Sequence, residues 1–225
     1  MHGFLFLLLF GGAVGGTDLE KARDAQDRPA LERFASQYTS AAQGKANDAA
    51  AQYKAALAES YMAEVAIEMR DKNAAHAAAE VGIKIAEKAV SLKGDVAEYH
   101  RLLGTLCGQV ISSAGLAGLK YGRCAQEEVN KALQLDGKSS VNYVARGVGY
   151  YYLPSGLGGG IDLAIKDFQK AIEIDGQSAE AQLWLGIALR KQNKNADARK
   201  AFQKALELNP GRVWAKQQLD KTPAQ

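Results

Sequence analysis

The stretch from 179 to 210 constrains the fold of this chain more than any other part of it. It reads AEAQLWLGIALRKQNKNADARKAFQKALELNP, which is two helix-forming segments joined by a polar turn. Gly186 on the first segment and Ala198 on the second are small enough to let two antiparallel helices approach closely, and Phe202 fills the space between them. Pro210 cannot continue a helix, so it ends the unit. The stretch therefore predicts an antiparallel helix pair.

The positions of these small and aromatic residues match a known repeat. The unit resembles a tetratricopeptide repeat, a helix–turn–helix of about 34 residues, at Leu185, Gly186, Ala198, Phe202, Ala205 and Pro210. It departs from that motif at Gln182, where an aromatic residue is usual, and at Leu189, where a tyrosine is usual. The resemblance implies a binding scaffold and leaves the identity of the partner open.

Weaker copies of the pattern precede this unit. Gly147 and Ala164 repeat the close approach, and so do Gly104 and Ala125 over a longer interval that indicates an insertion. A second insertion forms the loop 153–160. The four expected repeats span 47–94, 95–137, 138–176 and 177–210.

The ends of the repeats and of the array also carry signals. Gly94, Gly137 and Gly176 close the first three repeats, where we expect glycine to supply a left-handed residue. Thr17 and Glu20 have the spacing of a capping box, so a helical segment over 17–44 is expected to cap the array at its N-terminal end. A polar helix within 211–225, with Val213, Trp214 and Leu219 on it, is expected to cap the C-terminal end.

Composition agrees with an all-α class. The chain has 225 residues, 47% hydrophobic and 8% aromatic, with four prolines, and no long stretch alternates with the period of a strand. We therefore expect a right-handed α-solenoid of antiparallel helix pairs, a superhelix of the tetratricopeptide type. The net charge is only +3, and basic and acidic residues are interleaved, which argues against nucleic-acid binding.

Residues 1–16 resemble a secretory signal peptide. An unbroken apolar run from Phe4 to Phe10 is followed by small residues suited to cleavage near Gly15 or Gly16, although no Lys or Arg precedes the run. The apolar segment is shorter than the roughly 20 residues that span a bilayer. We expect a periplasmic or secreted protein with no stable membrane span after cleavage, and an N-terminal membrane anchor is the alternative.

No residue pattern points to catalysis. Ser155 is not in a nucleophile elbow, and His2, His76 and His100 have no metal-ligand spacing, so we expect no enzyme, cofactor or metal. Cys107 and Cys124 are interpreted as buried free thiols, with a bridge between them as the alternative, because the repeat frame offsets them along their two helices and thiols often act as small core hydrophobes. The glycine-rich stretch 156–160 is interpreted as a structural turn.

The inner face of the first helix of each repeat is the candidate binding surface. Tetratricopeptide arrays usually turn this face toward their ligand. On the repeat frame, an apolar groove with basic groups toward its ends is expected from Arg101, Val144, Val148, Tyr151, Tyr152, Leu183, Ile187, Arg190 and Lys191. Val144 and Val148 occupy places where relatives that grip a carboxylate have polar residues, so no carboxylate clamp is expected.

Two functions remain open from the sequence. The first is a non-enzymatic scaffold that binds a protein or peptide partner in the cell envelope. The alternative is a carrier, or an accessory subunit of a transporter, with a small hydrophobic ligand in an apolar cavity lined by Val144, Val148 and Tyr151. The long first helices and the insertion at 153–160 also resemble, less specifically, the T component of TRAP-type transporters and regulators of microtubule dynamics, and the export signal fits the transporter relation better.

Overall fold

The structure is a computed structural model that describes residues 17–113 and 118–224, and the expected signal segment 1–16 lies outside them. In these residues the chain forms helices and no strand, which confirms the all-α prediction. The helices are α1 (Asp18–Asp24), α2 (Arg28–Gly44), α3 (Ala49–Glu68), α4 (Lys72–Leu92), α5 (Ala97–Ser113), α6 (Gly118–Leu135), α7 (Ser140–Tyr152), α8 (Ile161–Ile174), α9 (Ala179–Lys191), α10 (Asn195–Leu208) and α11 (Val213–Asp220), with a 3-10 turn η2 (Ser155–Leu157).

Side-chain caps explain where several of these helices begin. The Thr17 hydroxyl accepts from the Glu20 amide at 3.2 Å, and the Glu20 carboxylate accepts from the Thr17 amide at 2.6 Å. Carboxylates of Asp27, Asp48 and Asp71 accept from free amides in the first turns of α2, α3 and α4. The chain is therefore locally encoded to start helices at these points.

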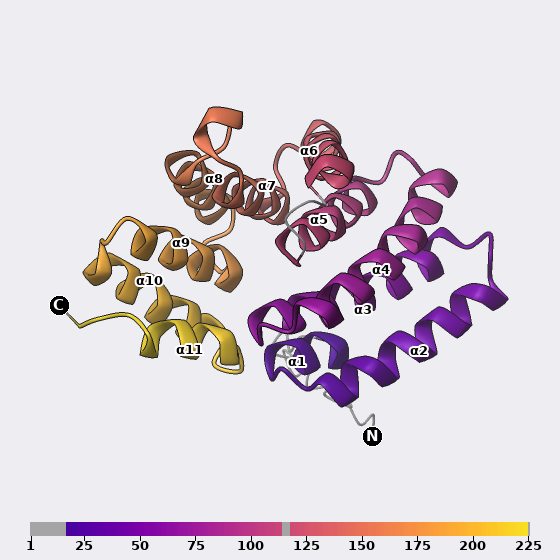
Figure 1. Ribbon diagram of the computed structural model, residues 1–225, viewed down its shortest axis with the longest axis horizontal. Coiled ribbons are helices and arrows are strands. Elements are labelled where there is room, and N and C mark those ends of the chain that lie inside the picture. The colour runs from indigo at the N-terminus through magenta and orange to yellow at the C-terminus, as the bar shows by residue number, and fades with distance from the viewer. Residues whose placement is uncertain (1–16, 114–117, 225) are drawn as a thin grey trace, which may run out of the picture.

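Helices follow one another as antiparallel pairs arranged along a closed curve (Figure 1). The pairs α3–α4, α5–α6, α7–α8 and α9–α10 each form a hairpin, and each hairpin packs on the next. The first helices α5, α7 and α9 lie on the inner side of the curve, with α6, α8 and α10 outside them. Helices α1 and α2 pack on α3 at one end, and α11 packs on α10 at the other.

The turns between helices are built differently from the expectation. Positive φ occurs at Gln26, Arg70 and Asn193, which lie in the tight turns inside helix pairs, and not at Gly94, Gly137 or Gly176. At two of the turns between pairs, an aspartate carboxylate accepts from the amide two residues on: Asp136 from Lys138 and Asp175 from Gln177. The expectation that glycine supplies a left-handed residue at the ends of the repeats was therefore wrong.

The insertion in the second repeat lengthens its two helices. Helices α5 and α6 have 17 and 18 residues, against 13 and 14 in α9 and α10. Because both helices grow, Cys107 and Cys124 come level with each other, their Cα atoms are 6.1 Å apart, and they form a disulfide. The interpretation of these residues as free thiols was wrong. The repeat frame placed Cys124 near the start of the second helix, whereas α6 already begins at Gly118, so Cys124 lies further along the helix and opposite Cys107.

The insertion in the third repeat forms a compact loop. The amides of Leu157 and Gly159 donate to the Pro154 carbonyl, and the Gly160 amide donates back to the Tyr150 carbonyl at 2.9 Å. Gly158 and Gly160 have φ of 85° and 121°, which only glycine adopts readily. The loop thus uses its own amides to turn the chain from α7 into α8.

Candidate partner-binding face

Apolar side chains recur along one side of α7. Val141, Val144, Val148 and Tyr152 follow at helical spacing. Val141 is 53% exposed and Tyr152 is 51% exposed, while Val144 and Val148 are half-buried. Both ends of this stripe are therefore open to a partner, and its middle packs into the fold.

At the C-terminal end of α7 the stripe continues into a cluster of aromatic rings. Tyr152 lies 6.2 Å from Trp184 on α9, Tyr151 lies 5.9 Å from the same ring, and Trp184 lies 5.3 Å from Trp214 on α11, all edge to face. We call Tyr151, Tyr152, Trp184 and Trp214 the aromatic face. It joins three helices from two repeats and the C-terminal segment.

The two tryptophans were not among the predicted site residues. They are the two tryptophans in the chain, and both are half-buried on the aromatic face. Trp184 directly follows Leu183, which was predicted to point inward, so a register shift of one residue would have found it. Trp214 had been assigned to the cap alone.

Three predicted groove residues do not line an open surface. Leu183 and Ile187 are buried in the core of the last helix pair, against Phe202 and Ala215. The Arg190 guanidinium donates to the carbonyl oxygen of Gln218 at 3.1 Å, which fixes the end of α11. Their expected place in the groove is therefore corrected: two form core, and Arg190 has a structural partner.

The other basic residues of the predicted groove lie apart from each other. Lys191 is exposed and its ammonium lies 5.9 Å from the centre of the Tyr151 ring, so it stands at the rim of the aromatic face. Arg101, on α5, pairs with Glu98 at 3.4 Å and its buried Nε has no hydrogen-bond partner among the described residues. Its charge acts on Tyr53 and Tyr61 of α3 rather than on the aromatic face.

Tyr152 is a neutral group at physiological pH. About half of its surface is exposed, and the remainder is surrounded by protein. This partial burial, and to a smaller extent the charge of the nearby Tyr151 hydroxyl when it ionises, raise the pKa of Tyr152 to about 12. The face therefore offers ring surfaces and neutral hydroxyl groups with a cation at its rim. Such a surface suits an apolar side chain more than a charged substrate.

Next to this face, a cluster of charged side chains joins the two ends of the superhelix. The Arg212 guanidinium, only 2% exposed, contacts Glu68 with two N···O distances of 2.5 and 3.1 Å and Glu64 at 2.6 Å. It also donates to Glu180 at 2.8 Å. We call Arg23, Asp24, Glu64, Glu68, Glu180 and Arg212 the clasp.

The clasp has more acidic than basic groups, and this imbalance, together with burial, shifts the pKa values of its side chains. Burial would lower the pKa of Arg212, but Glu180, Glu64 and Glu68 hold that pKa well above its usual value. Burial raises the pKa of Glu68 to about 7, against the opposing charge of Arg212. Burial also raises the pKa of Glu64. Arg212 and Arg23 outweigh burial at Glu180 and lower the pKa of that carboxyl.

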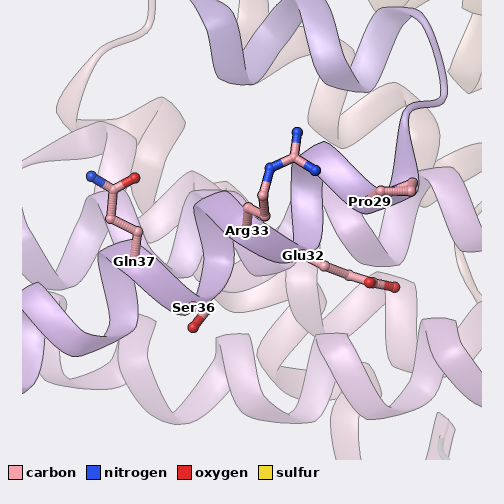
Figure 2. Close-up of a pocket in the computed structure, with 5 residues that line it drawn as sticks. All are labelled: Pro29, Glu32, Arg33, Ser36 and Gln37. Atoms are coloured by element: carbon pink, nitrogen blue, oxygen red, sulfur yellow. The ribbon is translucent and has the colours of Figure 1, made fainter.

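Two pockets on the described surface are lined by residues outside the aromatic face and the clasp. One, of about 590 Å³, is lined by five residues of α2, whose side chains project in different directions along the helix (Figure 2). The other, of about 250 Å³, lies between α2, α3 and α4. Neither is lined by Val144, Val148 or Tyr151. Across 17–113 and 118–224, no group of His, Cys, Asp and Glu side chains could hold a metal ion, and no helix is long and apolar enough to cross a membrane.

Comparisons with known proteins agree with this architecture. Residues 158–213 match the family model of the tetratricopeptide repeat. A tetratricopeptide repeat protein from Thermus thermophilus has a similar structure, with a TM-score of 0.61 and 17% identity over 90% of this chain and 99% of that chain. HusA haemophore from Porphyromonas gingivalis has a TM-score of 0.50 and 19% identity over 87% of this chain and 94% of that chain. Curated protein sequences give no match.

Proposed function

Because this chain is a tetratricopeptide repeat protein, we propose that it is a non-enzymatic scaffold that binds a protein or peptide partner through the aromatic face, and that it works in the cell envelope. The observation that carries the proposal is the contact of the half-exposed Tyr152 with the partly buried Trp184 and Trp214 at the junction of α7, α9 and α11. Tyr and Trp are the residues most enriched where binding energy concentrates in interfaces.

The chemistry of the face defines the kind of partner. Tyr152 and Trp184 present ring surfaces, and the exposed Lys191 ammonium stands beside Tyr151. An apolar side chain would pack on the rings, and a carboxylate next to it would pair with Lys191. The partner we propose is a segment of polypeptide with an apolar residue close to an acidic one.

Two observations support the envelope. The Cys107–Cys124 disulfide is typical of proteins outside the reducing cytosol. The apolar run from Phe4 to Phe10 resembles an export signal. Cell fractionation and the mass of the mature N-terminus test this part: cleavage near residue 16 and recovery with soluble envelope proteins are expected. A full-length chain in the membrane fraction would support the anchored alternative instead.

The alternative function is that of a carrier for a small hydrophobic ligand. HusA haemophore, whose fold is similar, is described as a haemophore, which keeps this alternative open. A carrier needs an enclosed apolar cavity, and the two pockets described above are lined by other residues. Native mass spectrometry of protein purified from its source separates the two functions, because it would show a bound small molecule, a bound protein, or neither.

Site-specific photocrosslinking tests the scaffold directly. A photoreactive amino acid at Tyr152 is expected to capture one defined polypeptide in living cells, whereas the same amino acid at Gln203, exposed on the outer helix α10, is not. In a second experiment the photoreactive amino acid replaces Lys191. Capture from position 191 should then be lower in a chain that also carries Tyr152→Glu than in one with Tyr152. The matched control is Val81→Glu on α4, which is 44% exposed and should leave capture unchanged. Equal capture at positions 152 and 203 would remove the proposal.

A further inference from the structure

We propose that the clasp is a reversible latch that holds the superhelix closed near pH 5, opens as pH rises toward neutrality, and thereby regulates access of a partner to the aromatic face. The regulation of access rests on the proposed function, whereas the latch itself does not. Its two halves come from opposite ends of the chain: Arg23, Asp24, Glu64 and Glu68 from α1 and α3, and Glu180 and Arg212 from α9 and the turn before α11.

The ends of the superhelix meet through polar side chains. Besides the contacts of Arg212 with Glu64 and Glu68, the guanidinium of Arg23 lies 3.4 Å from the Glu180 carboxylate. The Asn209 amide donates to Asp24 at 2.8 Å, and the Gln217 amide donates to Gln26 at 3.0 Å. Each of these contacts can exchange for water when the ends part.

Among the described residues, the buried apolar cluster of each end is separate from that of the other end. The core of the N-terminal end contains Leu31 and Val65, with rings of Phe34 and Tyr61 against it. The core of the C-terminal end contains Leu183 and Phe202, with Trp184 and Trp214 against it. We call the contact between the two ends, made by the clasp and the amides of Asn209 and Gln217, the seam. Because each end has its own core, the seam can separate while both ends stay folded.

The charges of the clasp give the seam its pH dependence. Two guanidinium groups face four carboxylates, so full ionisation leaves an excess of buried negative charge. The charged groups facing Glu64 and Glu68 are Arg212, Glu180, Arg23 and Asp24. From the start of α2 and the turn before α4, Arg28 and Asp71 pair with each other at 3.0 Å.

The sign of the effect follows from proton binding. In the closed form the pKa of Glu68 is about 7, compared with 4.5 for a glutamate in water. The closed form therefore binds more protons than the open form between pH 4.5 and pH 7, and closure weakens as pH rises across that window. Well above pH 7 the Glu68 carboxyl is ionised in both the open and the closed form, so the ratio of open to closed molecules reaches a plateau.

The latch is in direct contact with the aromatic face. The Arg212 guanidinium lies 5.6 Å from the centre of the Trp214 ring, and Trp214 lies 5.3 Å from Trp184. If the Arg212 guanidinium separates from its carboxylate partners, it is also expected to move away from the Trp214 ring. Trp184 and Trp214 are half-buried in the closed form, whereas Tyr152 is already half exposed. Opening the contact between the ends is therefore expected to expose more of the two tryptophan rings and to strengthen the binding of a polypeptide at the aromatic face.

A distance measurement across the seam tests the latch without any partner. Spin labels are attached at Lys21→Cys on α1 and Lys216→Cys on α11, two exposed positions, and the intrinsic cysteines are protected as a disulfide. At pH 5.5 pulsed electron paramagnetic resonance is expected to show one narrow distance. At pH 8 the ratio of molecules with a longer distance to molecules with the short distance should be roughly 30 times the ratio at pH 5.5. In Arg212→Ala the longer distances should dominate at both pH values.

Two further variants separate protonation from simple loss of charge. Glu68→Gln mimics the protonated carboxyl and is expected to keep the short distance at pH 8. Glu207→Gln changes the charge equally at an exposed pair with Lys204, and should respond to pH as the natural chain does. Far-UV circular dichroism verifies that each variant is folded. The latch is overturned if the natural chain and Arg212→Ala give the same single distance at both pH values, or if Glu68→Gln responds to pH as the natural chain does.

Photocrosslinking at position 152, repeated at pH 5.5 and pH 8, tests the regulation. Greater capture at pH 8 and in Arg212→Ala is expected. If the spin-label distances change and capture does not, the regulation of access is overturned and the scaffold stands. If position 152 captures no polypeptide in any form, the proposed function fails, while the distance measurement still decides whether the latch exists.

Discussion

Gly147 on α7 and Phe168 on α8 interlock, because a Cβ atom on Gly147 would lie 2.5 Å from the Phe168 ring. Gly186 and Phe202 have the same relation in the next helix pair, at 2.6 Å. Both rings are fully buried and cannot move away without displacing their neighbours. The missing side chain of glycine and the ring opposite it thus fix how closely the two helices approach in the pairs α7–α8 and α9–α10.

Replacing this glycine should therefore destabilise the fold. We expect Gly147→Ala to lower the free energy of unfolding by about 1–3 kcal/mol through overpacking. Gly149→Ala is the matched control, since an added Cβ there meets nothing within 4 Å. It should raise the free energy of unfolding by about 0.5–1 kcal/mol, because alanine favours helix over glycine. Urea unfolding followed by circular dichroism measures both, and shifts of the same sign would contradict this account.

The disulfide of the second repeat makes a separate prediction. Cys107 and Cys124 are 17 residues apart, and closing a loop of this size stabilises a fold by about 3 kcal/mol in the chain-entropy model. Reduction should lower the midpoint of thermal unfolding by about 6–12 °C for a chain of this length. The double variant Cys107→Ala with Cys124→Ala is the control. It has no disulfide, so adding the reductant should leave its midpoint of thermal unfolding unchanged.

The local part of the fold could be read from the sequence. Gly186, Ala198 and Phe202 act over a short interval, so their spacing predicted an antiparallel helix pair and an all-α fold of the tetratricopeptide type, both of which are confirmed. The glycine acts as expected, although the group that fills its space is the Phe202 ring. Local spacing fixes such contacts because both partners belong to one hairpin.

The contacts between distant parts could not be read in this way. Arg212 and Glu68 are ordinary charged residues in the sequence, and they meet because the rotation from each helix pair to the next brings the ends together. No local pattern records the sum of these rotations. The same reason hid the aromatic face, since Trp184 and Trp214 belong to different units and become neighbours through the packing of α11.

Arg190 illustrates a predicted ligand-binding residue with a structural role. Its guanidinium donates to the Gln218 carbonyl at 3.1 Å and to the Thr222 hydroxyl at 3.3 Å. Arg190→Ala should weaken the attachment of the end of α11 by about 1–2 kcal/mol, which corresponds to roughly tenfold faster hydrogen exchange over 218–222. Lys191→Ala, an exposed neighbour, should leave exchange unchanged. Equal exchange in the two variants would show that Arg190 does not hold this segment.

Glu59 on α3 provides a test of pH dependence that is independent of the clasp. It is buried beside Gly82 of α4, and burial raises its pKa to about 7 from 4.5. An acid whose pKa is higher in the folded chain binds more protons there, so its contribution to stability falls as pH rises from 4.5 to 7. Glu59→Gln removes this titration and should be more stable than the natural chain at pH 8 by about 1–2 kcal/mol, after allowance for partial screening by solvent.

The comparison across pH isolates this carboxyl from the others. At pH 4.5 the difference in unfolding free energy between Glu59→Gln and the natural chain should be small, since Glu59 is then largely protonated when folded, and it should grow as pH rises toward 8. Glu127→Gln, at an exposed carboxylate paired with Arg123, is the matched control and should show no such growth. A constant difference between Glu59→Gln and the natural chain at all pH values would mean that the Glu59 carboxylate finds compensation inside the fold.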